Sequence, residues 1–135
     1  MKRWRIRSYV GANNALIVKE WLNSVPFSVA TTFVTHLKFL VGQPPVNWKR
    51  PYVSVLSGGK RTRKTGCAGL VELRFDSGNV EYRPLGYYSG PMEFTIVFFA
   101  IEKGSAFEPK GACKIAKERK LKIYNNKELA REFDL

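Results

Sequence analysis

The chain is poor in the residues that build metal sites and disulfide frameworks. Its 135 residues include one histidine, His36, and two cysteines, Cys67 and Cys113, which stand far apart and outside any CxxC spacing. We therefore expect no metal site, no cofactor and no disulfide framework. Both thiols are interpreted as reduced, small apolar side chains in a cytoplasmic protein. His36 falls beside an apolar stripe, where a structural histidine is more common than a catalytic one.

Long apolar runs and common catalytic motifs are also missing. No stretch approaches the roughly 20 apolar residues that a membrane-spanning helix needs. The basic start of the chain is followed by polar residues, which excludes the apolar core of a signal peptide. No P-loop, GxGxxG or GxSxG occurs. We therefore expect no membrane partner, and nothing predicts a nucleotide cofactor or a serine hydrolase.

Acidic residues are scarce relative to basic ones. The chain has 11 Asp and Glu against 23 Lys and Arg, a formal net charge of +12. Such an excess on a small domain favours a polyanionic partner, with nucleic acid ahead of an anionic membrane. An acidic protein partner, or charge that only keeps the protein in solution, are the alternatives. Because 44% of the residues are hydrophobic, we expect one folded domain with a substantial core.

The hydrophobic periodicity predicts a strand, two helices, three strands and a third helix. The expected strands are 3–10, 70–76, 79–88 and 93–101, and the expected helices are 14–23, 28–41 and 109–119. Residues 76–79 (Asp-Ser-Gly-Asn) form a strong hairpin turn signal, and residues 43–69 are loop-like. The strand at 93–101 is apolar on both faces, so we expect it to be central in the sheet.

This order predicts an α+β fold, β-α-α-β-β-β-α. Its sheet would be mainly antiparallel and four-stranded, with the helices packed on one face. Residues 1–120 would form the domain. Residues 121–135 would be a C-terminal extension, either a short helix or a frayed tail.

Charged side chains gather on two neighbouring strands of the predicted sheet. Glu72 and Arg74 share one face of the first strand, and Arg83 lies on the next strand. On its own this pattern favours a solvated sheet face with cross-strand Glu–Arg pairs. The functional interpretation is RNA cleavage, in which Glu72 accepts the proton of the ribose 2′-hydroxyl and Arg74 and Arg83 clamp the phosphate.

Further residues are candidates for the same chemistry. Lys103, at the end of the last strand, could add charge or donate a proton. Tyr87 or Tyr88 could stack on a base or donate a proton. Basic stripes and a basic loop could contact RNA phosphates independently of sequence. The alternative interpretation is that these residues are a plain solvated surface. These RNA-binding candidates are Arg5, Arg7, Lys60, Arg61, Arg63, Lys64, Tyr87, Lys110 and Lys114.

Several short pieces of the chain resemble the RelE/ParE superfamily of toxins from bacterial toxin–antitoxin modules. Residues 69–74 (Gly-Leu-Val-Glu-Leu-Arg) are similar to a strand of its phage-derived HigB-type branch, and Tyr82-Arg83 to the next strand. Lys103 followed by Pro109 resembles the lysine-rich strand end before a helix-opening proline. The resemblance covers roughly residues 3–120.

The resemblance implies a ribosome-dependent, metal-independent endoribonuclease that cuts translated mRNA and inhibits translation. It places Glu72 and Arg74 at acid/base and phosphate-binding positions, Arg83 at the strand arginine, and Lys103 near the C-terminal catalytic positions. It also implies a cognate antitoxin as partner. Two alternatives stay open: a ParE-like inhibitor of DNA gyrase, and a non-catalytic phage-encoded module that binds RNA or protein.

Overall fold

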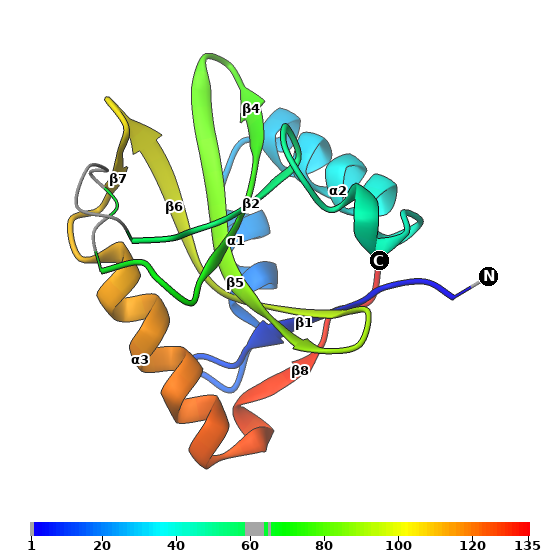
Figure 1. The fold of residues 1–135 in the computed structure, drawn as a ribbon, viewed down its shortest axis with the longest axis vertical. Coiled ribbons are helices and arrows are strands. Elements are labelled where there is room, and N and C mark those ends of the chain that lie inside the picture. The colour runs from blue at the N-terminus through cyan, green and yellow to red at the C-terminus, as the bar shows by residue number, and fades with distance from the viewer. Residues whose placement is uncertain (1, 59–63, 65) are drawn as a thin grey trace.

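The computed structural model describes residues 2–58, 64 and 66–135, and in it eight strands and three helices follow one another along the chain. Two short 3-10 turns, η1 and η2, complete the element order (Figure 1). The elements are β1 (Arg5–Tyr9), α1 (Ile17–Ser24), α2 (Phe27–Val41), η1 (Pro45–Asn47), β2 (Val53–Val55), β3 (Val71–Leu73), β4 (Phe75–Ser77), β5 (Val80–Gly90), β6 (Glu93–Lys103), β7 (Ala106–Glu108), α3 (Ala112–Asn125), η2 (Lys127–Leu129) and β8 (Ala130–Glu132).

All eight strands join one mixed sheet with the order β2-β3-β5-β6-β1-β8. β4 pairs with β5, and β7 pairs with β6. β1 runs parallel to β6, while the other pairs are antiparallel. The prediction of a mainly antiparallel, four-stranded sheet is therefore wrong. β2, β7 and β8 have three residues each, which is too short for a period of two to stand out in the sequence.

The helices cover both faces of the sheet, so the prediction that they pack on one face is also wrong (Figure 1). One core cluster joins α2 to the sheet through Phe33, Leu37 and Ile96. A second cluster joins α3 to the opposite face through Ala116 and Val97. The physical reason was present in the sequence: β6 is apolar on both faces, and a strand of that kind must be covered on both sides.

A β-bulge in β6 sets which residues face which helix. Leu85 pairs with Phe98 but Gly86 pairs with Ile96, so Val97 is the extra residue. Gly86 is required there, because a Cβ atom at that position would lie 2.1 Å from the backbone oxygen of Thr95. β6 is central between β5 and β1, as its two-sided apolar pattern predicted.

The predicted turn between β4 and β5 is confirmed. Gly78 and Asn79 both have positive φ, 57° and 64°, as a two-residue hairpin of primed type requires. The segment after α3 forms the short 3-10 helix η2, in line with the expected short helix. It then forms the strand β8, which was not expected and which pairs with β1 and is followed by the buried Phe133. Across the described residues, no helix is long and apolar enough to cross a membrane.

The two cysteines are joined, which corrects the interpretation of both as reduced thiols. A disulfide links Cys67, just before β3, to Cys113, in the first turn of α3, across 46 positions of sequence. No local pattern in the sequence indicates this link, because the proximity of the two residues depends on how α3 returns over the sheet.

Candidate functional site

The centre of the candidate site is Glu72, a carboxylate with no exposed surface in the middle of β3. Its Oε1 lies 2.8 Å from Arg74 Nη1 and 3.2 Å from Lys64 Nζ. Arg83 Nε lies 3.7 Å from its other oxygen, Oε2. A buried carboxylate is stable only when it is paired in this way, since an unpaired charge away from water is very costly.

Glu102, from the distant strand β6, completes the group. Its Oε1 accepts hydrogen bonds from Lys64 Nζ and Arg83 Nε, both at 3.0 Å. Burial acts to raise the pKa of Glu102, but the hydrogen bonds and charges of Lys64 and Arg83 outweigh it and lower that pKa. We call these five residues the ion-pair network: Lys64, Glu72, Arg74, Arg83 and Glu102.

Arg83 is the most enclosed cation of the network. Only 2% of the residue is exposed, and it also donates from Nη1 to the backbone oxygen of Tyr82 at 2.8 Å. Besides Glu72 and Glu102, it lies 3.3 Å from a carboxylate oxygen of Asp76 and 3.6 Å from one of Glu81. Four carboxylates therefore surround one guanidinium.

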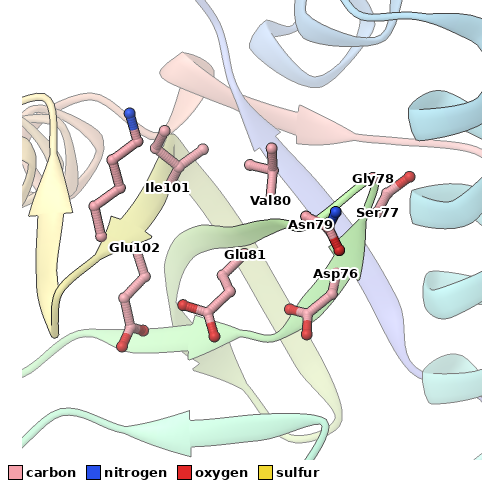
Figure 2. Close-up of a pocket in the computed structure, with 9 residues that line it drawn as sticks. Asp76, Ser77, Gly78, Asn79, Val80, Glu81, Ile101 and Glu102 are labelled. Atoms are coloured by element: carbon pink, nitrogen blue, oxygen red, sulfur yellow. The ribbon is translucent and has the colours of Figure 1, made fainter.

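Three of those carboxylates form a row across three strands. Asp76 is opposite Glu81 on β5, and Glu81 is opposite Glu102 on β6. The three residues line a cavity of about 430 Å³, and Figure 2 shows their side chains pointing in the same direction. Like charges directly opposite one another destabilise a sheet, so we interpret Arg83 as the cation that neutralises the row.

The predicted grouping of Glu72, Arg74 and Arg83 is thus confirmed, but the predicted open, solvated face is wrong. Arg83 is only 2% exposed and its guanidinium is already engaged by four carboxylates, so it is not placed to clamp a phosphate. The pattern missed this because the network also contains Lys64, from what reads as a loop before β3, and Glu102, from the distant strand β6.

A cleft of about 620 Å³ opens beside the network. Arg74 and Lys64 reach its wall, with 19% and 13% of their side chains exposed. Arg50 also lines it; it is exposed and makes no ion pair within the described part of the chain. The remaining polar lining includes Glu102 and the hydroxyls of Ser54, Ser57 and Ser105.

Sequence reasoning missed Arg50, and no sequence signal pointed to it. It precedes Pro51 in what reads as a loop. Only the short strand β2 brings this segment to β3, where Val53 pairs with Leu73 and the backbone N–H of Arg74 donates to the backbone oxygen of Tyr52.

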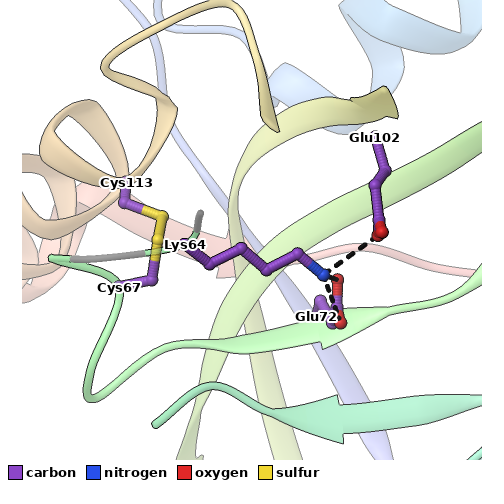
Figure 3. Close-up of a disulfide and its surroundings, with 5 residues drawn as sticks. All are labelled: Lys64, Cys67, Glu72, Glu102 and Cys113. Carbon is purple, nitrogen blue, oxygen red and sulfur yellow. Dashed lines mark hydrogen bonds and ion pairs between the residues drawn. A yellow bond between two sulfur atoms is a disulfide. The ribbon is translucent and has the colours of Figure 1, made fainter. Parts of the chain in front are cut away.

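Lys64 enters the network from a segment that the disulfide attaches to α3. Figure 3 shows its side chain extending from beside Cys67 toward Glu72 and Glu102. Its ammonium also lies 4.7 Å from the ring centre of Phe107. Lys64, predicted as a loop cation for RNA, is therefore mainly a partner of two carboxylates.

Two predicted catalytic residues lie outside the network. Tyr88 is on the opposite face of the sheet, where its ring packs 5.8 Å from that of Trp4 and 6.1 Å from that of Trp48. The Lys103 side chain is 66% exposed and pairs with Glu108 at 3.5 Å. Neither side chain lines the cleft.

The predicted RNA-binding residues are spread over several places. Lys60, Arg61 and Arg63 lie outside the described residues. Arg5 pairs with Glu93 and Glu132 at the surface. Lys110 and Lys114 are exposed near the start of α3, while Arg7 and Tyr87 line a separate cavity at its end.

His36 has a structural setting. Its Nε2 lies 3.3 Å from the backbone oxygen of Tyr52. Burial lowers the pKa of His36, and the hydrogen bond to Tyr52 opposes that effect only in part. At neutral pH the ring is therefore uncharged, which suits a side chain packed beside the core.

No set of three or more His, Cys, Asp or Glu side chains within the described positions is arranged to hold a metal ion. No family model, curated protein or solved structure matches this chain. The site is therefore interpreted from its own geometry.

Proposed function

We propose that this protein is a toxin-type endoribonuclease that cuts translated mRNA without a metal cofactor, and that the cleft beside the ion-pair network receives the scissile phosphate. One observation carries the proposal: Arg50 and Arg74 line the same cleft as the carboxylate of Glu102 and the ammonium of Lys64. Two guanidiniums suit a phosphodiester, because their paired donors match its oxygens.

The proposed reaction is transfer of the phosphoryl group to the neighbouring ribose oxygen. The 2′-hydroxyl gives its proton to Glu102 while its oxygen bonds to phosphorus, and Arg50 and Arg74 bind the phosphate oxygens, on which negative charge increases. The bond to the 5′-oxygen breaks, and that oxygen takes a proton from Lys64. The products are a cyclic 2′,3′-phosphate and a free 5′-hydroxyl.

Glu102 is offered as the proton acceptor because its carboxylate lines the cleft; its ion pairs lower its pKa, which keeps it ionised but makes it a weaker base. Glu72 has no exposed surface, so we assign it the role of positioning Arg74 and Lys64 rather than touching RNA. This assignment replaces the sequence-based choice of Glu72 as the base.

The proposal includes a place and a partner. Translated mRNA is found in the cytoplasm, so we propose that location; the reduced thiols that first pointed there are replaced by a disulfide, a bond uncommon in that compartment, so the location rests on the proposed substrate alone. A neutralising antitoxin would need acidic surface to complement a formal net charge of +12.

The test is mRNA cleavage in a purified translation system, mapped by primer extension with and without ribosomes. We expect ribosome-dependent cuts that Arg50→Ala abolishes. Lys49→Ala is the matched control, because it removes the same charge from an exposed neighbour that does not line the cleft. Intact mRNA at every protein concentration, or equal cutting by Arg50→Ala and the parent, would overturn the proposal.

One observation favours a second candidate, a non-catalytic RNA-binding module. Lys64, Arg74 and Arg83 are all already paired with carboxylates. On this interpretation the network is a structural element and RNA binds elsewhere. Salt-sensitive RNA binding with no cleaved product would support it.

A further inference from the structure

A second cavity, of about 630 Å³, lies on the α3 face of the sheet at the end of α3. We call it the α3 cavity. Its lining combines three cations with hydroxyl and aromatic groups, and it shares no residue with the cleft. The lining residues used below are Arg7, Tyr87, Glu93, Lys120, Tyr124 and Lys127.

The cations of the α3 cavity are not neutralised by carboxylates. Among the described residues, none of the ion pairs involves Arg7, Lys120 or Lys127. The carboxylate of Glu93 is engaged elsewhere, because it accepts from Ser89 at 2.8 Å and pairs with Arg5 at 3.2 Å. The α3 cavity therefore keeps a positive field that the ion-pair network lacks.

Arg7 has hydrogen-bonding capacity to spare. Its Nη2 donates to the backbone oxygen of Ala130 at 2.6 Å, which fixes the guanidinium against β8. Its Nε is buried, and no described group of the protein accepts from it. A guanidinium has five N–H donors, so most of those on Arg7 are not used by the protein itself.

Aromatic side chains line the same cavity. Tyr87 lies under Lys120, whose ammonium is 5.0 Å from the ring centre. Tyr124 is 82% exposed although it follows the buried Ile123 on α3. An exposed tyrosine next to unpaired cations is the combination that proteins use to stack one base and bind its phosphate.

We propose that the α3 cavity is a second nucleotide-binding site for a single-stranded RNA, in which Arg7, Lys120 and Lys127 bind phosphate and Tyr124 stacks on a base. The inference rests on the proposed function for its ligand, RNA, but it does not require that the protein cleaves RNA. Ser89 lies six positions along β5 from Arg83, about 20 Å away, so one strand of RNA can reach both sites.

The test uses fluorescence anisotropy with a labelled, short 2′-O-methyl RNA, which lacks the attacking hydroxyl and cannot be cut. We expect the double variant Lys127→Ala, Tyr124→Ala to weaken binding by about tenfold or more. A plot of the logarithm of the binding constant against the logarithm of the salt concentration should become less steep by about 0.7, because one phosphate-binding cation has been removed. Tyr124→Phe, which keeps the stacking ring, should bind as the parent does.

Lys38→Ala is the matched control, since Lys38 is also exposed but lies on α2, on the other face of the sheet. It should weaken binding by less than about twofold. A duplex of the same sequence, whose bases are already stacked, should bind Tyr124→Ala and the parent alike.

Equal RNA affinity for the parent and the double variant would overturn the inference, and so would an equal weakening in Lys38→Ala. These outcomes are independent of cleavage. If the protein cuts no RNA but the double variant binds RNA more weakly than the parent, the nuclease proposal fails and the second site stands.

Discussion

The ion-pair network and the α3 cavity treat positive charge in opposite ways. In the network, the cations are paired with carboxylates and almost removed from water. In the α3 cavity, Arg7, Lys120 and Lys127 have no carboxylate partner in the described part of the chain. The network cations therefore mainly hold the fold together, while the cavity cations remain available to a ligand.

The largest effect should come from removing the central cation of the network. Arg83→Ala leaves an empty, buried position and takes a charged partner from the buried Glu72 and the nearly buried Glu102, and we expect the free energy of unfolding to fall by about 3–5 kcal/mol. Urea denaturation measures it. Lys127→Ala, in the α3 cavity, should leave stability nearly unchanged. Similar stability for both variants would remove the distinction between the network and the cavity.

The disulfide should be the next largest contribution. It closes a loop over 46 positions, so replacing both Cys67 and Cys113 by Ser should lower stability by up to about 4 kcal/mol. Thermal and urea unfolding would be compared for the parent with and without dithiothreitol. The reduced parent and the double variant should agree. Two free thiols by mass, with no effect of reductant, would show that the bond is not formed in solution.

A smaller effect should appear in the pH dependence of stability. Because the pKa of Glu102 is lowered in the folded state, its contribution is present above the ordinary glutamate value of about 4.3. It is lost as pH falls through the lower, folded-state pKa. Glu102→Gln should reduce the fall in the free energy of unfolding between about pH 5 and 3, measured by urea denaturation at each pH. An unchanged fall would show that other carboxylates account for it.

The same contrast explains what the sequence could and could not predict. The β4–β5 turn and the central position of β6 were predictable, because turn residues and two-sided apolar patterns are local signals. Whether Arg83 faces water was not, since a strand pattern assigns a side chain to a face but not the cover over that face. Around Arg83 the enclosing carboxylates come from four strands, β3, β4, β5 and β6.

The α3 cavity could not be predicted from the sequence for a related reason. Arg7 and Tyr87 stood among the RNA-binding candidates, but they lie on strands 80 positions apart, and the parallel pairing of β1 with β6 brings those strands close. A crossover of that length leaves no periodic trace in the sequence. Lys120, Tyr124 and Lys127 would otherwise read as an ordinary solvated helix end.

The position of β8 has a consequence for how the chain is made. β1 is synthesised long before residues 130–132, the segment that pairs with its outer edge and places Glu132 opposite Arg7. Until β8 has been made, the emerging protein carries an open strand edge, the kind of surface at which chains aggregate or exchange segments. Deleting residues 130–132 would make that transient exposure permanent.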